Sequence, residues 1–338
     1  MTRPFPLVPL DPAGLQRRIP FAPHELVDRI TAQRDLFLLA HLGIPQLDPT
    51  SWTLAIDGLV ERPQSFSIDA IHRLPRRTVE SFHQCAGYPR RPEIATRRIA
   101  NVVWGGADLA EVLHAAGIRP EARFLWAYGV DHGDYDGVHA ACYLKDVPLA
   151  RIGVGGALLA YEINGEPLTR EHGAPLRLVV PGYYGTNLVK WLCRLELADR
   201  RALGPFTTTF YNDPIPPTEG GMDGATRPVW EAPPEAVIVA PQAGARLLQA
   251  AIEIWGWAWA AAGVERVEIS VDDGASWGAA ALEPRRQWSW QRFRFPWRPA
   301  ASGQVTLMAR ATDTTGRTQP ANNARNAVHT VTVEMALG

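Results

Sequence analysis

The sequence predicts two domains, a mixed α+β domain followed by an all-β sandwich. A chain of 338 residues, 46% of them hydrophobic, exceeds the size at which one core usually keeps growing. Helical and strand patterns alternate up to about residue 200, whereas the chain from about 235 onward is patterned as strands. We expect a first domain at 1–204, a Pro/Gly-rich linker at 205–234 that wraps rather than folds, and a second domain at 235–338.

Short patterns define elements of the first domain. Leu54 and Ile56 alternate with polar or small residues before Asp57-Gly58, which is typical of a half-buried strand closed by a turn. Ser67 is placed to cap a short helix, and Gly117 to end a second one. The apolar face of that second helix is formed by four residues, Leu109, Val112, Leu113 and Ala116.

The second domain is predicted as a succession of strands. Large residues alternate at 252–259, 267–271, 288–297, 305–309 and 331–333, with a change of phase around Gly256 that predicts a bulge. Asp272-Asp273-Gly274 predicts a hairpin turn rather than a calcium loop, because the other ligand positions are missing. The strand number and spacing are those of an immunoglobulin-like sandwich, with its tryptophans in the core or at the rim.

Charge and hydropathy exclude two classes of partner. A net charge of -1, with cations spread along the chain, leaves no basic face for nucleic acid or for an anionic membrane surface. The longest apolar stretches are far shorter than a membrane-spanning helix. Prolines at 4, 6, 9 and 12 interrupt any signal peptide, so we expect a cytoplasmic protein, or a periplasmic one if a leader has been removed.

One cysteine lies in a pattern that indicates chemistry. Cys85 ends an alternating run over 79–85 and precedes a turn at Gly87, so it would project at a strand end, where sites are commonly built. Arg90 and Arg91 follow, and a positive field favours a thiolate, which is either a nucleophile or a soft metal ligand. A buried structural cysteine is the alternative. The other two cysteines, Cys142 and Cys193, have mainly apolar neighbours and are assigned to the core.

A second stretch, at 159–191, combines glycine turns with cations. Pro181-Gly182 and Gly185 let the backbone approach a ligand closely. His172, Arg177 and Lys190 are donors suited to an anionic oxygen, which indicates a phosphate site. Taken alone the pattern is weak, because His172 could simply satisfy a local carbonyl group.

Together these stretches resemble the sulfite oxidase family of molybdopterin enzymes. The motifs that carry the resemblance are Cys85-Ala-Gly-x-x-Arg90, Trp104 in Val-Trp-Gly-Gly-Ala-Asp-Leu, Ala-Tyr-Glu-x-Asn-Gly-x-Pro-Leu, His172-Gly-x-Pro-x-Arg177, Pro-Gly-x-x-Gly185 and Val-Lys190-Trp. Residues 256–259, 267–277 and 311–320 are similar to the family's immunoglobulin-like dimerisation domain. The resemblance implies a molybdenum-molybdopterin oxidoreductase, and the structural alternative for Cys85 loses most of its weight.

The resemblance assigns a role to individual residues of this chain. Cys85 is the implied thiolate ligand of molybdenum. The residues implied to hold the pterin and its phosphate are His41, Asp131, His172, Arg177, Gly185 and Lys190. The residues implied for the substrate pocket are Arg90, Trp104, Tyr211 and Arg325.

Three departures from the family pattern affect the anion pocket. Leu39 stands where the family has the arginine of Phe-x-Arg-Asn-His, with His41 as the histidine. The usual Trp-Asn-x-Arg-Gly stretch is shortened to Asn323-Ala-Arg325, and Tyr88 replaces a common asparagine. The metal site is therefore expected to be complete and the anion pocket reduced.

The expected function is oxygen-atom transfer that oxidises sulfite or a related small oxyanion. No haem motif occurs in the chain, so a separate acceptor such as a cytochrome would take the electrons. Reduction of S-oxides or nitrate is the alternative within enzymes, because one metal site runs in either direction. A cofactor-free binding module that kept the fold is the alternative outside enzymes. The resemblance also implies a homodimer through the second domain.

Overall fold

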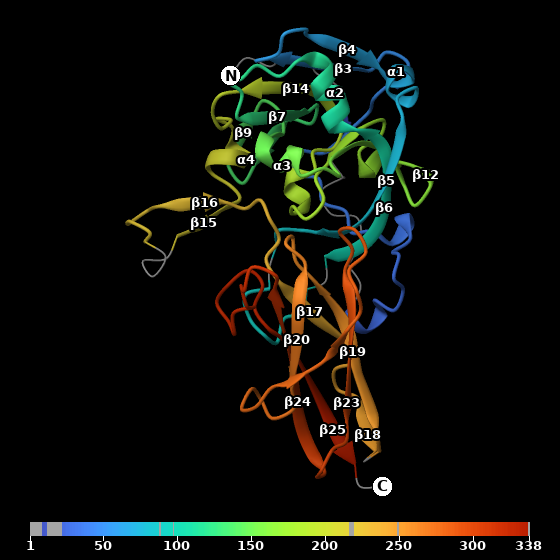
Figure 1. Ribbon diagram of the computed structural model, residues 1–338, viewed down its shortest axis with the longest axis vertical. Helices are drawn as coiled ribbons and strands as arrows, with labels where there is room; N and C mark the ends of the chain where they lie inside the picture. Colours follow the sequence, from blue (N-terminus) through green and yellow to red (C-terminus); the bar gives the residue numbers. More distant parts are fainter. Residues whose placement is uncertain are drawn as a thin grey trace. The chain divides into compact units, whose positions relative to one another are not determined.

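The computed structural model describes residues 9–11, 22–87, 89–96, 98–215, 220–248 and 250–336. Contacts divide the chain into two units, here called the first and second units (Figure 1). The first unit comprises residues 1–19, 37–79 and 103–230, and the second comprises 20–36, 80–102 and 231–338. Of the described helices, none is long and apolar enough to cross a membrane.

Two sheets organise the first unit. One has the strand order β10-β7-β14-β3-β4, with bounds Leu144–Pro148, Phe124–Gly129, Leu192–Ala198, Thr53–Gly58 and Gln64–Ser67. The other has the order β12-β11-β6-β5, with bounds Glu166–Pro167, Leu158–Ile163, Ile99–Asp108 and Arg76–Gln84. Strand β13, Arg177–Val179, also pairs with β11. Strand β5 ends in the second unit and strand β6 begins there. Cys85, which follows β5, therefore belongs to the second unit.

Helices in the described chain are few and short. The α-helices are α1 Ile68–His72, α2 Leu109–Ala116, α3 Leu149–Gly153 and α4 Pro205–Thr208. Single 3₁₀ turns are η2 Pro23–Glu25, η3 Gln33–Asp35, η4 Arg170–His172 and η5 Gly185–Asn187. The predicted caps are confirmed, because the Ser67 hydroxyl accepts a hydrogen bond from the Ala70 amide and Gly117 has φ +74°.

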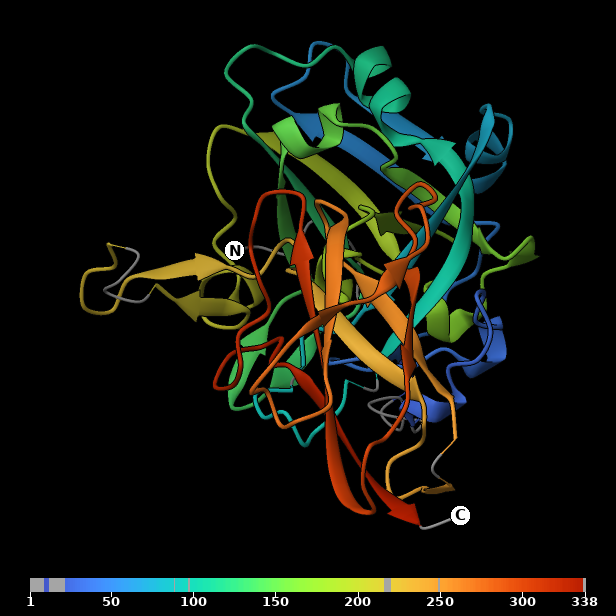
Figure 2. The same ribbon diagram turned by 60° about the horizontal axis from the view of Figure 1, so that its bottom comes forward.

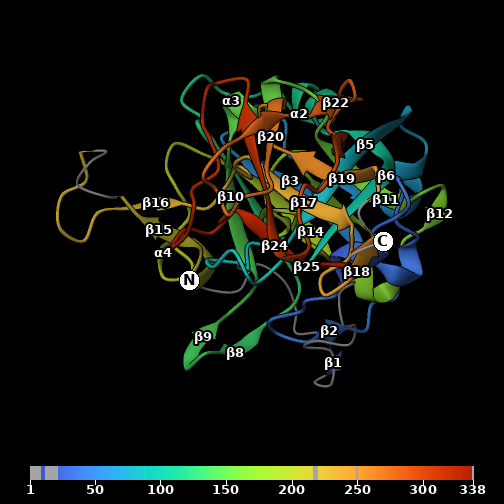
Figure 3. The same ribbon diagram turned by 90° about the horizontal axis from the view of Figure 1, so that it is seen from below.

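Three two-stranded ribbons complete the first unit. They pair β1 Leu10–Asp11 with β2 Ile44–Pro45, β8 Gly133–Tyr135 with β9 Val138–Ala140, and β15 Asn212–Pro214 with β16 Thr226–Pro228. The β8–β9 ribbon follows β7 and extends away from its sheet (Figure 3). The β15–β16 ribbon likewise extends away from the sheets of the first unit (Figures 1 and 2).

The second unit contains the predicted sandwich. One sheet has the order β17-β19-β23-β22, with bounds Glu235–Ala240, Ile252–Trp259, Gln291–Trp297 and Ala281–Leu282. The other has the order β18-β25-β24-β20-β21, with bounds Arg246–Leu248, His329–Ala336, Gly303–Asp313, Val264–Ser270 and Gly278–Ala279. Inward side chains of both sheets, including Ile254, Phe293 and Leu307, form one apolar cluster. The predicted fold class, α+β followed by an all-β sandwich, is confirmed.

The expected bulge is on a different strand. Strand β19 runs without interruption through Gly256, and the register slips instead in β17, between Ile238 and Ala240. A Cβ at Gly256 would lie 1.9 Å from the Val237 carbonyl oxygen and 2.7 Å from the Phe293 ring. The glycine is therefore required by the close approach of neighbouring groups.

The region between the predicted domains is more ordered than the sequence indicated. Residues 205–234 include helix α4 and the ribbon β15–β16, because the proline ring of Pro205 suits the first position of a helix and Pro228 pairs in a two-stranded ribbon without a central strand's hydrogen bonds. Residues 216–219 lie outside the described chain. The division into 1–204, 205–234 and 235–338 stays a prediction. The units differ from it mainly in that 20–36 and 80–102 group with the sandwich.

Candidate cofactor and substrate site

Cys85 follows directly on the last residue of β5 and is 7% exposed. Its amide donates to the Arg98 carbonyl oxygen over 3.0 Å, which ties the cysteine to the residue before β6. The Cys85 Sγ atom accepts from the Gly87 amide at 3.4 Å and from Arg98 Nη1 at 3.8 Å. We call Cys85, Ala86, Gly87 and Arg98 the cysteine turn. Its sulfur is a buried soft donor that faces two N–H groups, an arrangement suited to an anionic thiolate.

The two arginines expected to create a positive field at this sulfur lie outside the cysteine turn and are exposed. Arg90 is exposed, and its carbonyl oxygen accepts from the Asn323 amide at 2.7 Å. Arg91 is also exposed and pairs with Glu93. Arg325 donates from its guanidinium to the Ala86 carbonyl oxygen, so this residue does lie against the cysteine turn. Tyr88 lies outside the described residues.

A buried polar chain supports the strand that carries Cys85. Gln84 accepts a hydrogen bond from the Trp259 indole at 2.9 Å and donates to the Glu235 carboxyl group. Thr96 also donates to Glu235, which is 2% exposed and forms no ion pair with any described residue. Burial raises the pKa of Glu235 to about 8, although the hydrogen bond from Gln84 opposes the shift. Glu235 is therefore largely protonated at neutral pH.

The protonated Glu235 gives stability a predictable pH dependence. An unfolded chain loses this proton near the ordinary pKa of 4.5, whereas the folded protein keeps it up to about 8. The contribution of Glu235 to the free energy of unfolding should therefore fall as pH rises through that window and level off above it. Urea unfolding between about pH 5 and about pH 9 measures the slope. Glu235→Gln should flatten it while the exposed Glu265→Gln should not, and an unchanged slope in Glu235→Gln would contradict the assignment.

In the first unit, a group of donors gathers around η4 and β13. The Arg177 guanidinium donates to the carbonyl oxygens of His172 at 2.9 Å and Leu188 at 3.0 Å, and it lies 4.7 Å from the Trp104 ring centroid. Trp104 is fully buried and Arg177 is 3% exposed. Burial lowers the pKa of Arg177 to about 9. Trp104, expected in the substrate pocket, is thus a platform for the predicted phosphate-binding arginine.

Lys190 and Asp131 extend this group. We use the name cation cluster for four residues together: Asp131, His172, Arg177 and Lys190. Lys190 donates to the Glu171 carbonyl oxygen at 2.9 Å, and its side chain packs where a Cβ on Gly173 would lie only 3.0 Å away. Burial and the charge of Arg177 lower the pKa of Lys190, whereas burial raises that of Asp131. Both shifts indicate a buried cluster whose charges are poorly compensated.

An unsatisfied donor in the cation cluster indicates a missing anion. The Arg177 Nε–H group is buried and has no hydrogen-bond partner among the described residues, and the buried Asp131 Oδ1 atom, which also has none there, needs a donor instead. An anionic ligand would supply the acceptor that Arg177 lacks and would restore the charge balance of Lys190. Gly185 begins η5, and its carbonyl oxygen accepts from the Leu188 amide at 3.1 Å, so the glycine turn lies next to the Leu188 carbonyl that Arg177 contacts. The residues therefore fit a phosphate-bearing cofactor.

His41 lies in a cage of aromatic rings in the first unit. Its ring centroid is 4.8 Å from Tyr135, 5.6 Å from Tyr143, 5.2 Å from Phe206 and 5.7 Å from Tyr211. Its Nε2 atom is hydrogen bonded to the Tyr211 hydroxyl. Burial, followed by the charges of Lys190 and Lys145, lowers the pKa of His41 to about 3. His41 is therefore neutral and orients the Tyr211 hydroxyl without adding positive charge.

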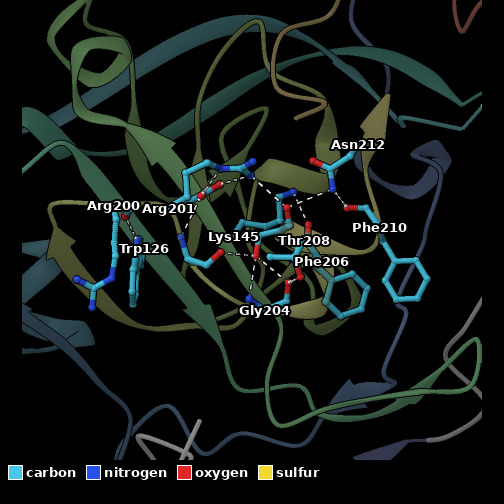
Figure 4. A network of polar contacts seen from close by, with 12 residues as sticks. Trp126, Lys145, Arg200, Arg201, Gly204, Phe206, Thr208, Phe210 and Asn212 are labelled. Atoms are coloured by element: carbon cyan, nitrogen blue, oxygen red, sulfur yellow. Dashed lines mark hydrogen bonds and ion pairs between the residues drawn. The ribbon is translucent and has the colours of Figure 1, made fainter. Parts of the chain in front are cut away.

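Lys145 is fully buried and belongs to a network of polar contacts with the segment around Phe206 (Figure 4). Its ammonium donates to the Phe206 carbonyl oxygen at 2.7 Å and lies 5.5 Å from the Tyr211 ring centroid. Burial lowers its pKa to about 7. The adjacent Asp146 carboxylate accepts from Arg201 at 2.9 Å and from the Ala202 amide at 3.1 Å, so it is already engaged. This network fixes the segment around α4 that carries Phe206 and Tyr211.

Sequence reasoning missed several of these residues. Lys145 is signalled only by a cation next to Asp146 in the short strand β10. The aromatic residues that surround His41 lie up to 170 positions from it in the chain. Arg98 lies thirteen residues after Cys85, and only the pairing of β5 with β6 brings it to the sulfur. Glu235 is a solitary carboxyl group at the start of β17. Cys142 and Cys193 pack against apolar clusters, as predicted.

Comparison with known proteins places these groups in a family. Residues 41–206 match the family model "Oxidoreductase molybdopterin binding domain", and residues 226–334 match "Mo-co oxidoreductase dimerisation domain". Sulfite oxidase of Arabidopsis thaliana is 31% identical over 334 residues, which cover 88% of this chain and 84% of that protein. The chain belongs to the sulfite oxidase family of molybdopterin-dependent oxidoreductases. The family's cofactor is molybdenum bound to molybdopterin.

Other relatives span a range of activities. Mitochondrial sulfite oxidase of Mus musculus is 34% identical over 86% of this chain, but the chain spans only 57% of that protein. An NADH nitrate reductase of Ulva prolifera is 26% identical over 84% of this chain and 37% of its own. The solved structure of sulfane dehydrogenase SoxCD from Paracoccus pantotrophus is similar with a TM-score of 0.78 and 28% identity, covering 99% of this chain and 94% of that one.

Proposed function

We propose that this oxidoreductase oxidises sulfite or a related small sulfur oxyanion and passes the electrons to a separate protein. The observation that carries the proposal is the half-buried Tyr211 hydroxyl, held by a neutral His41 beside the Lys145 ammonium, since this group can donate to an oxyanion. Two matched relatives are named sulfite oxidases, and the similar solved structure is that of a sulfane dehydrogenase, so all three names refer to a sulfur compound. Cys85 would bind the molybdenum, and the cation cluster would hold the pterin phosphate.

The protein's own residues bind and orient while the cofactor, when bound, supplies two-electron oxygen-atom transfer. With the Nε2–H tautomer of His41 donating to the Tyr211 hydroxyl oxygen, the Tyr211 O–H group would donate to a substrate oxygen, and the rings around His41 would exclude water from this hydrogen bond. Arg90 and Arg325, assigned by resemblance, would add positive charge. Sulfite oxidation to sulfate takes up one water and releases two protons and two electrons, so turnover requires an acceptor.

A turnover panel on metal-replete protein tests the proposal. Protein purified from a molybdenum-replete host is assayed with sulfite and an artificial electron acceptor, and with S-oxides and nitrate and a reduced dye. Turnover on sulfite supports the proposal. Turnover only on S-oxides or nitrate would move the function to reduction, which the match to a nitrate reductase makes the second candidate. If the purified protein holds neither molybdenum nor pterin, the alternative of a cofactor-free binding module is favoured.

Leu39 gives a further prediction, because it offers no donor where relatives have a guanidinium. One charge-assisted hydrogen bond contributes about 1.5–3 kcal/mol, so sulfite should bind roughly tenfold to hundredfold more weakly than in relatives with that arginine. Leu39→Arg should therefore lower the Michaelis constant for sulfite at unchanged metal content, provided that the half-buried site accepts the charge. Steady-state kinetics at fixed ionic strength measure the change. A tight Michaelis constant in the natural protein would contradict the prediction.

We also propose that the chain forms a homodimer through residues 226–334, where the dimerisation model matches. Analytical ultracentrifugation tests this, and a purely monomeric species at micromolar concentration would contradict it. The electron acceptor, such as a cytochrome, and the cytoplasmic location stay predictions from the sequence.

A further inference from the structure

Arg98 and Cys85 make two hydrogen bonds with each other, and the proposed function assigns no role to Arg98. The Cys85 amide donates to the Arg98 carbonyl oxygen at 3.0 Å, and Arg98 Nη1 donates back to the Cys85 Sγ atom at 3.8 Å. The Gly87 amide donates to the same sulfur at 3.4 Å. Two positions of the chain thus direct N–H groups at one buried sulfur.

The shape of the turn keeps Arg98 in this position. A Cβ on Gly87 would lie 3.2 Å from Arg98 Nη2 and 3.4 Å from its Cζ atom, so the absence of a side chain there lets the guanidinium approach the turn. Arg325 donates to the Ala86 carbonyl oxygen, and this hydrogen bond holds the Ala86–Gly87 peptide in place. Arg98 itself is only partly exposed and has no ion pair with a described residue. Its charge is therefore available to the sulfur.

We propose that Arg98 is a positioning residue that tunes the metal through its ligand, by hydrogen bonding and by its positive charge at the Cys85 sulfur. The proposal rests on the proposed function, because it takes Cys85 as the molybdenum ligand. A donor at a thiolate withdraws electron density from the sulfur and so favours the reduced state of a bound metal. Arg98 acts on the midpoint potential of the site and does not contact the substrate.

The test is a potentiometric titration of the metallated protein and its variants, monitored by the spectroscopic signals of the bound molybdenum. Arg98→Gln removes the charge and should lower the midpoint potential, changing the one-electron equilibrium about threefold to tenfold, where tenfold is about 59 mV. Arg98→Lys keeps a charge but loses the planar donor, so it should shift the potential less. Gly87→Ala keeps Arg98 and displaces its guanidinium by a few tenths of an ångström, and it should lower the potential slightly.

Arg91→Gln is the matched control, since it removes a charge from the same segment at an exposed side chain paired with Glu93. Its potential should equal that of the natural protein. Equal potentials in Arg98→Gln and Arg91→Gln, at normal molybdenum and pterin content, would overturn the role of Arg98 and leave the proposed function intact. Natural protein that holds no molybdenum after growth in replete medium would overturn the proposed function instead. If Arg98→Gln does not fold, Gly87→Ala and Arg98→Lys decide the question by the same titration.

Discussion

Cys85→Ser should give a folded protein that has lost turnover by more than about 100-fold, because even residues that only orient metal ligands typically contribute 10–100-fold. A serine hydroxyl is harder and less readily ionised than a thiol, so it is a poor ligand for a metal that prefers sulfur. The substitution is nearly isosteric at a position that is 7% exposed, and the backbone hydrogen bond to Arg98 is unaffected. Turnover per molybdenum and a thermal melt measure the two parts of the prediction.

Cys193→Ser is the matched control for this experiment. Its sulfur donates to the Tyr128 carbonyl oxygen at 3.3 Å in the first unit, and a hydroxyl can make the same bond. Its turnover should therefore remain near that of the natural protein. Full activity in Cys85→Ser would contradict the assignment of Cys85 as the molybdenum ligand, whatever the control shows.

Arg177→Ala should purify with roughly tenfold to hundredfold less bound cofactor, since one charge-assisted phosphate contact is worth about 1.5–3 kcal/mol. The loss should exceed any change in the intrinsic rate of the sites that remain filled. Lys190→Ala should act in the same direction, because both cations belong to a buried cluster that lacks compensating charge. Pterin fluorescence and molybdenum content per protein measure occupancy, and turnover per molybdenum measures the rate.

Folding must be separated from cofactor binding in these variants, because Arg177 also satisfies the carbonyl oxygens of His172 and Leu188. The melting temperature of cofactor-free protein supplies that control. Arg200→Ala, at a side chain 71% exposed, should leave cofactor content unchanged. Normal pterin content with lost turnover in Arg177→Ala or Lys190→Ala would assign these residues to the reacting centre.

Local pattern was sufficient for much of the fold. Alternation located β3, β20 and β24, and the spacing of Leu109, Val112, Leu113 and Ala116 located α2, because side-chain burial has a period of two in strands and 3.6 in helices. Pattern was least informative at 205–234, where prolines indicated an unstructured linker although a short helix and a ribbon form. Both elements form within the segment itself, since β15 pairs with β16 only about a dozen residues further along the chain, at positions where prolines hid the strand pattern.

The sequence by itself determined the family and the fold class and singled out Cys85 as the candidate metal ligand, because motif order and hydrophobic period are properties of the chain. It also singled out His172, Arg177 and Lys190, since cations near glycine turns are visible as spacing. Tertiary structure alone decided what lies beside each of them. Arg98 reaches the Cys85 sulfur because β5 and β6 pair, and Lys145 and His41 meet the Tyr211 ring although the three lie far apart in the chain. Their charges and proton affinities then follow from burial, which a sequence does not state.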